Sequence, residues 1–212
     1  MLQCPLMLIT AHPVYQKITW RLIPVLFTCY VMAYLDRVNV GFAKLSMKEE
    51  PWFSEAVFAT GSGIFFIGYF LFEVPGNLIL HRIGARIWIT RIMISWGILS
   101  CLCALSSSPA MFYSLRFLLG VAEAGFFPGI ILYLTYWYPG NYRARIVALF
   151  MTAVAFAGII GSPLSGWILK QTSEWVSGKA WQWLFLIEGI PSILLGIFIP
   201  WLLSNNPQQA SW

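Results

Sequence analysis

The chain has 212 residues, of which 59% are hydrophobic and 10% charged, and its net charge is +5. Soluble domains carry about a quarter charged residues, so this composition excludes an ordinary soluble protein. The basic residues are divided among short connections along the chain. This division argues against a nucleic-acid-binding surface, which needs a basic patch on one face. The sequence therefore predicts an integral membrane protein.

Six apolar stretches follow one another, and each has about the 20 residues that a bilayer-spanning helix needs. They run from Leu22 to Ala43, Phe58 to Leu80, Ile87 to Leu105, Met111 to Tyr138, Ile146 to Leu169 and Trp183 to Leu203. Strand alternation is absent and the stretches are about twice the length of barrel strands. Since only helices and closed barrels satisfy the backbone in lipid, the predicted fold is all-α with six transmembrane helices.

Lysine and arginine outside the spans predict the orientation, because cytoplasmic loops carry an excess of them. One side carries the basic residues Lys17, Arg21, His81, Arg82, Arg86, Arg143 and Arg145. On the other side Lys48 is balanced by Glu49, Glu50 and Glu55, and the connection 106–110 is uncharged. We expect an inner (plasma) membrane location with both termini cytoplasmic, residues 1–16 as a leader without a cleavable signal, and 17–204 as the bundle.

The four cysteines, Cys4, Cys29, Cys101 and Cys103, lie in the tail and in predicted helices. Their spacing is not that of a CxxC motif, and no second ligand cluster accompanies them. We therefore predict neither a disulfide framework nor a metal site, and His81 is interpreted as a loop residue.

The first stretch contains a charged motif, Tyr34-Leu-Asp36-Arg37-Val-Asn39-Val-Gly41. At helical spacing Tyr34 and Arg37 share one face, and Asp36 and Asn39 share another. Ionisable groups at membrane depth are costly, so they usually face a protein interior or a watery cavity and mark a functional site. The alternative is a charge pair that reaches the headgroups, but Asp36 and Asn39 are too short for that.

The fourth stretch carries Arg116 and Glu123 on one face, about 10 Å apart along the helix axis. They cannot neutralise each other, so each needs a partner from another helix, and Asp36 and Arg37 are the nearest complements. Gly120 between them is small enough to let a neighbouring helix approach. The alternative is a purely structural salt bridge, although buried ion pairs stabilise weakly.

Two further motifs are predicted to act in gating or packing. The connection Asn77 to Arg86 contains a glycine turn between basic residues, with Arg82, Gly84 and Arg86 as its candidates. In the fifth stretch, a seam of small residues from Gly158 to Gly166 includes Gly161 and the helix-bending Pro163.

Together these motifs resemble the major facilitator superfamily, and within it the anion:cation symporters, which include galactonate, glucarate, tartrate and phthalate carriers. The resemblance runs from about Val14 to the last residue. The loop departs from the superfamily pattern at Asn77, His81 and Ala85. The superfamily has twelve helices in two halves. The resemblance thus implies that this chain is an N-terminal half, with 205–212 beginning the central cytoplasmic linker.

The resemblance also implies roles for single residues. Arg37 would meet the substrate carboxylate, with Tyr34, Asn39 and Tyr69 beside it, while Asp36 and Glu123 would take up protons and Arg116 would be coupled to them. Protonation of a carboxylate held by an arginine frees that arginine for an anion. Glu188 is expected to be structural near the cytoplasmic mouth, and the role of Glu73 stays open.

The function predicted from this is proton-coupled symport of an organic anion such as a sugar acid or dicarboxylate, with no enzyme activity and no cofactor besides the proton. The expected partners are the anion, membrane lipid, and a C-terminal half or a second copy. The alternative is a truncated, non-transporting remnant or interaction subunit. A cation or drug antiporter is disfavoured because Arg37 and Arg116 attract anions.

Overall fold

The computed structural model describes residues 13–175 and 179–210, without the side chains of 174, 175 and 209. Its helices are α1 (Pro13–Met47), α2 (Glu55–Ile83), α3 (Ala85–Cys103), α4 (Pro109–Glu123), α5 (Phe126–Trp137), α6 (Gly140–Trp175), α7 (Ala180–Leu202) and the short 3₁₀ helix η2 (Pro207–Gln209). Six spans are long and apolar enough to cross a membrane, with α4 and α5 together forming one. The described residues contain no strand, and the predicted all-α class with six spans is confirmed.

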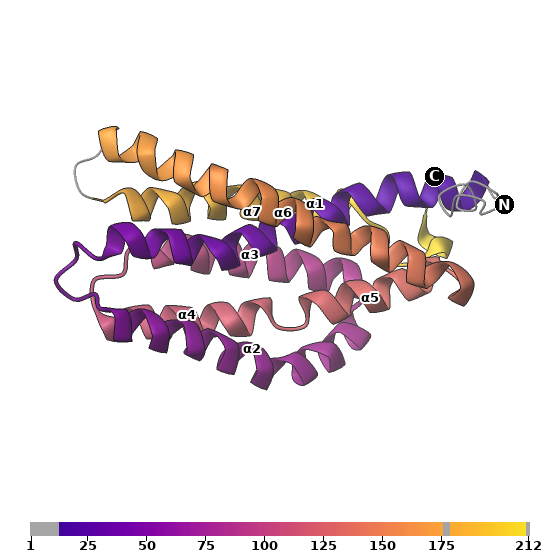
Figure 1. The fold of residues 1–212 in the computed structure, drawn as a ribbon. Helices are drawn as coiled ribbons and strands as arrows, with labels where there is room; N and C mark the ends of the chain where they lie inside the picture. The colour runs from indigo at the N-terminus through magenta and orange to yellow at the C-terminus, as the bar shows by residue number, and fades with distance from the viewer. Residues whose placement is uncertain (1–12, 176–178, 211–212) are drawn as a thin grey trace.

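The helices run side by side along one direction (Figure 1). Both described ends of the chain lie at one end of the bundle, which we call the basic end after Lys17, Arg21, Arg82, Arg86, Arg143 and Arg145. The α1–α2 and α3–α4 connections lie at the opposite end, which we call the loop end. There, Ser54 and Ser108 cap α2 and α4 by accepting hydrogen bonds from the backbone N–H groups of Val57 and Met111.

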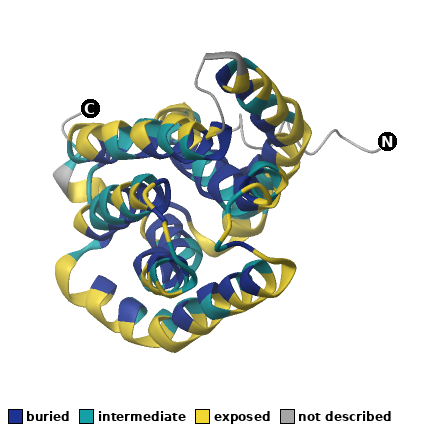
Figure 2. Ribbon diagram, turned by 90° about the vertical axis from the view of Figure 1, so that its left-hand side faces the viewer, coloured by how far each residue is buried: buried dark blue, intermediate teal, exposed yellow. Residues whose placement is uncertain are grey.

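Small residues bring the helices close together, as expected where association in lipid depends on tight packing. A Cβ built on Gly97 of α3 would lie 2.9 Å from the carbonyl oxygen of Gly189 on α7. A Cβ on Gly120 of α4 would collide with the carbonyl oxygen of Phe65 on α2. Buried residues gather toward the inside of the bundle and exposed ones on its outer faces (Figure 2). Many exposed side chains are large and apolar, among them Phe70 and Trp201, which suits contact with lipid.

The fourth span is broken, whereas the sequence predicted one continuous helix from Met111 to Tyr138. Helix α4 ends at Glu123, and Gly125 takes a positive φ of 80° before α5 begins at Phe126 (Figure 1). Pro128 has no N–H to donate to the carbonyl one turn earlier, and only glycine adopts this φ without strain. A side chain from another helix also satisfies one carbonyl near the break, because Arg91 Nη1 donates to the Ala122 oxygen at 3.2 Å. The break makes Glu123 the last residue of α4.

The predicted leader and linker fall partly outside the described residues. Of the leader 1–16, residues 1–12 and with them Cys4 are not described, and α1 begins at Pro13. Of the linker 205–212, residues 211 and 212 are not described, and 207–209 form η2. The start of this segment is docked to the basic end, because the backbone N–H of Arg86 donates to Asn205 Oδ1 at 3.2 Å.

Candidate functional site

The centre of the site is an ion pair between α1 and α4. Arg37 Nη2 lies 2.7 Å from Glu123 Oε1. The Glu123 side chain is 2% exposed and that of Arg37 is 31% exposed. The carboxylate is therefore buried behind the guanidinium, and the guanidinium keeps an open edge. This is the pairing that the sequence predicted for Glu123.

Aromatic rings of α2 flank the same guanidinium. The Arg37 Cζ atom lies 5.0 Å from the ring centroid of Tyr69 and 5.9 Å from that of Phe65. Such stacking holds a cation in place while leaving its edge free to donate. Tyr69 is half-buried, so a predicted member of the site lies beside Arg37. Tyr34, also half-buried, packs against a cluster that includes Ala153 and Ala157 of α6.

Arg116 is the second arginine of the site and is only 3% exposed. Its Cζ atom lies 4.8 Å from the Phe65 ring centroid, so both arginines lie near the Phe65 ring. Its Nε and Nη1 groups are buried without a hydrogen-bond partner. A buried cation with unpaired donors is costly, so this side chain is poised to receive an acceptor.

Asp36, the neighbour of Arg37, points to a different side of α1, toward α3, and is 4% exposed. It accepts hydrogen bonds from Trp96 Nε1 at 2.8 Å, from Asn39 Nδ2 at 3.4 Å and from the Ser100 hydroxyl. No ion pair joins it to Arg116, and this part of the predicted pairing is wrong. The reason is that α3, packed against α1, supplies neutral donors that fill the carboxylate's needs.

Two other predicted positions lie on this inner side. Asn39 is 0% exposed and stays with Asp36, away from the open edge of Arg37. Glu188 was predicted near the cytoplasmic mouth, and that position is wrong. It precedes Gly189, which packs against Gly97 and Cys101 of α3 next to the donors of Asp36, so Glu188 lies at the depth of Asp36. The close glycine contact between α3 and α7 sets this depth.

The predicted gating and packing residues have the following places. Gly84 ends α2 and begins α3 with a φ of 87°, and Arg86 donates its N–H to Asn205 Oδ1 at 3.2 Å beside an exposed Arg82. Gly120 makes the close α2–α4 contact described above. Pro163 lies inside α6, where a Cβ on Gly161 would be 3.0 Å from Leu35. A Cβ on Gly158 or Gly166 would meet nothing within 4 Å, so the predicted seam is tight only at Gly161.

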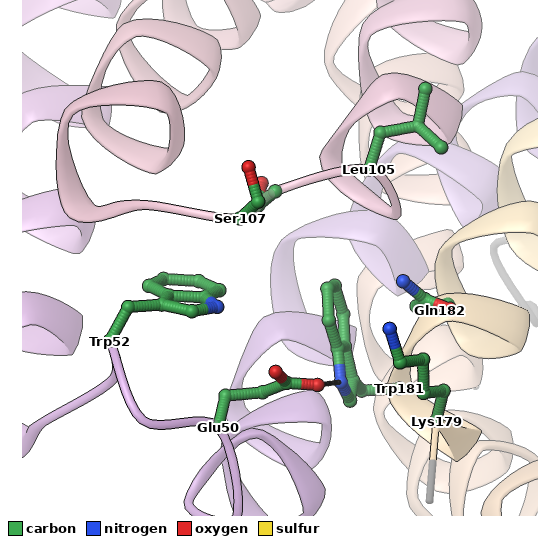
Figure 3. Close-up of a pocket in the computed structure, with 8 residues that line it drawn as sticks. Glu50, Trp52, Leu105, Ser107, Lys179, Trp181 and Gln182 are labelled. Carbon is green, nitrogen blue, oxygen red and sulfur yellow. Dashed lines mark hydrogen bonds between the residues drawn. The ribbon is translucent and has the colours of Figure 1, made fainter.

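A separate pocket of about 280 Å³ opens at the loop end (Figure 3). It is lined by Glu50, Trp52, Leu105, Ser106, Ser107, Lys179, Trp181 and Gln182. Trp181 Nε1 donates to Glu50 Oε1 at 3.2 Å across it. None of the predicted site residues lines this pocket. Across residues 13–175 and 179–210, no three His, Cys, Asp or Glu side chains come together to hold a metal.

Sequence reasoning missed the contribution of α3. Trp96 and Ser100 are one turn apart and share a face, a spacing that could have marked them as donors to a buried acid. Arg91 is a third arginine within a span, half-buried against the Trp88 ring at 4.0 Å. Its charge at membrane depth was the available signal.

Residues 26–212 match the family model described as Major Facilitator Superfamily. Over 198 residues the chain is 57% identical to a Pseudomonas putida protein named as a candidate metabolite transport protein, NicT, covering 93% of this chain and 45% of that protein. It is 53% identical over 199 residues to an Agrobacterium vitis protein named as a candidate tartrate transporter, covering 94% and 46%. The chain thus spans about half the length of these relatives, and corresponds to their N-terminal half.

The fold also matches a solved structure of a bacterial homologue of the human lysosomal transporter Spinster in an inward-facing, occupied conformation. The TM-score is 0.78 at 20% identity, and the match covers 93% of this chain and 46% of that one. At this identity the likeness establishes the fold alone.

Proposed function

The chain belongs to the Major Facilitator Superfamily of membrane transporters, and we propose that it forms the N-terminal half of a carrier that moves an organic anion together with a proton. The observation that carries this proposal is the Arg37–Glu123 pair, in which a buried carboxylate occupies a half-open guanidinium. A carboxylate substrate is the natural competitor for Glu123, because it offers Arg37 the same two acceptor oxygens.

The pair links the two ions by competition. When Glu123 takes up a proton, it loses its charge and its hold on Arg37. The open edge of Arg37 then binds the incoming carboxylate, with Tyr69 against the guanidinium. When the anion leaves on the other side, Glu123 releases its proton to water there and pairs with Arg37 again. One proton is thus carried for each carboxylate bound at this arginine.

The substrate class that we propose is a small hydroxy acid or dicarboxylate. Two arginines near one phenyl ring, Arg37 and Arg116, make this face attractive to anions, and the unpaired donors of Arg116 suit a second acceptor group. A relative at 53% identity bears the name of a tartrate transporter. In the whole carrier, a C-terminal half or a second copy of this chain would complete the binding site.

We also propose that the carrier lies in the plasma membrane with both termini of this half in the cytoplasm. The support is that basic residues, among them Lys17, Arg21 and Arg82, gather at one end of the bundle. Cytoplasmic loops carry an excess of lysine and arginine.

The experiment is uptake of labelled tartrate, galactonate and phthalate into proteoliposomes that contain this polypeptide, with and without an inward proton gradient. Each sample is repeated with a matching C-terminal half co-reconstituted. Gradient-dependent uptake in either sample supports the proposal. Absence of uptake in both, with correctly inserted protein, would instead favour a non-transporting remnant or an interaction subunit.

A further inference from the structure

A second carboxylate, Glu188 of α7, is buried without a cation. The residue is 6% exposed. Ser165 of α6 donates its hydroxyl to Oε1 at 3.0 Å. The other oxygen, Oε2, is buried and has no hydrogen-bond partner. One half of this carboxylate is therefore satisfied and the other half lacks a donor.

Asn39 connects this carboxylate to Asp36. Its Nδ2 donates to Asp36 Oδ1 at 3.4 Å, and the same amide side chain also interacts with Glu188. Its own oxygen, Oδ1, is fully buried and has no donor. Two acceptor oxygens without donors, Asn39 Oδ1 and Glu188 Oε2, thus belong to side chains that interact. A single added proton on Glu188 would remove its charge and turn one of its oxygens from an acceptor into a donor.

Glu188 has no countercharge of its own, although the charge of Arg116 acts on the neighbouring Asp36. From α1, Asp36 faces Glu188 with a second potential negative charge. From α6 the facing group is the Ser165 hydroxyl, and from α3 the Cys101 thiol packs against the adjacent Gly189. No lysine, arginine or histidine in the described part of the chain acts on Glu188. Two ionised carboxylates so placed would both be buried, with no cation in an ion pair with Glu188, which is strongly unfavourable in a low-dielectric interior.

We propose that Glu188 is a proton-binding residue, and that Glu188 and Asp36, bridged by Asn39, form a second proton site on the inner side of α1. Binding converts the Glu188 carboxylate and one proton from water into the neutral acid, and release reverses this with no other reactant. The site differs from the Arg37–Glu123 pair, because Asp36 points about 100° away from Arg37 around α1, although the charges of Asp36 and Arg116 act on Glu123. The role of this proton in transport rests on the proposed function. The existence of the proton site does not depend on it.

The first test detects the protonated carboxylic acid directly. Infrared spectra of this chain in liposomes without any organic anion, recorded over a pH series, should contain the carbonyl stretch of a buried protonated acid. Glu188→Gln should remove that band. Glu73→Gln, which makes the same chemical change at a half-buried acid of a different span, should keep it. Ser165→Ala should keep the band and shift its frequency, because it removes the donor to Oε1.

The outcomes are distinct. Persistence of the band in Glu188→Gln overturns the proposal. Loss of the band on adding sodium ions at constant pH overturns it too, because the oxygen cluster would then be a sodium site. If Glu188→Gln does not insert, an unshifted band in Ser165→Ala overturns it. These readouts need no transport, so a failure of uptake in the unmodified chain contradicts the proposed function alone.

A second test asks whether the proton is used. In liposomes with the complete carrier, Glu188→Gln should exchange tartrate across the membrane at a rate within about threefold of the unmodified protein. Its accumulation driven by a gradient of one pH unit should fall by about tenfold, the share that one coupled proton supplies. Accumulation equal to that of the unmodified carrier would limit Glu188 to a structural role and overturn its part in coupling.

Discussion

Asp36 and Arg37 are adjacent in sequence, yet α1 carries them into opposite surroundings. Arg37 keeps 31% of its side chain exposed and meets a single acid, Glu123, across 2.7 Å. Asp36 is buried among neutral donors from α3, Trp96 and Ser100, and meets a second acid through Asn39. The first surroundings respond to an anion, because a carboxylate can replace Glu123. The second have no open edge and no cation in an ion pair with Asp36, so we expect a proton rather than an anion to change their charge.

This difference divides the proposed symport between two sides of one helix. An anion that binds Arg37 displaces Glu123 but does not contact Asp36. The two sides are connected through α1 itself and through Arg116, whose charge acts on both Asp36 and Glu123. Substitutions on the Arg37 side should therefore change binding, and those on the Asp36 side should change coupling.

The largest effect is expected from Arg37→Ala, which removes the guanidinium from the anion side. Two charge-assisted hydrogen bonds are lost, so tartrate affinity should fall by about a hundredfold or more. Arg37→Lys keeps the charge but loses the bidentate geometry of the guanidinium. Its tartrate affinity should fall by about tenfold. Equilibrium binding of labelled tartrate to the reconstituted carrier measures both.

A control is needed because Arg37→Ala also strands Glu123, and an unpaired buried charge destabilises by about 3–5 kcal/mol. The double variant Arg37→Ala with Glu123→Gln removes that charge. It should recover thermal stability but not tartrate binding. Recovery of binding together with stability would mean that Arg37 acts by folding alone.

The next effect is expected from Asp36→Asn, which removes a charge from the inner side and keeps the shape. One coupled proton across a gradient of one pH unit is worth about 1.4 kcal/mol, which allows about tenfold accumulation. In Asp36→Asn the accumulation ratio should fall by about this factor, because the proton of Glu123 is still carried, while tartrate binding stays within about threefold. Parallel measurements of uptake and of binding check it, and normal gradient-driven uptake would contradict the role of Asp36.

Features of the fold and site that depend on neighbouring residues in the sequence could be predicted, whereas most features that depend on contacts between helices could not. The six spans follow from runs of apolar residues, and the Arg37–Glu123 pair follows from charge at membrane depth, since few complements exist. The sequence held a signal for the break, because Gly125 can adopt a positive φ and Pro128 follows three residues later. The apolar run nevertheless continues across both residues. Local hydropathy therefore outweighed the backbone signal.

The partners of Asp36 and Glu188 could not be predicted from the sequence, because they depend on how α1, α3 and α7 cross. The rotation of α3 against α1 determines whether Asp36 pairs with Arg116 or accepts hydrogen bonds from Trp96 and Ser100. The depth of Glu188 is set by the contact between Gly97 and Gly189. A single sequence contains these residues but does not state which glycine meets which.

A smaller effect is expected from Glu123→Gln, which removes the competitor of the anion and leaves Arg37 in place. Tartrate should bind a few times more tightly at neutral pH, and its affinity should lose most of its dependence on pH between 5 and 8. Titrations of binding at several pH values check this. An affinity that varies with pH as in the unmodified carrier would show that Glu123 is not the competing group.

The smallest effect is expected from Trp96→Phe, which keeps a ring on α3 but removes the N–H that donates to Asp36 Oδ2. A hydrogen bond to a charged group contributes about 1.5–3 kcal/mol, and one to a neutral acid nearer to 1. Trp88→Phe is the matched control, because Trp88 is as deeply buried on the same helix and its Nε1 has no partner. Thermal unfolding in detergent should place Trp96→Phe below Trp88→Phe. The gap between them should narrow when both are made in the Asp36→Asn background if the indole acts through the carboxylate's charge, because the asparagine oxygen still accepts a neutral hydrogen bond. A gap of unchanged size there would assign Trp96 to packing and leave Ser100 and Asn39 as the donors that hold Asp36.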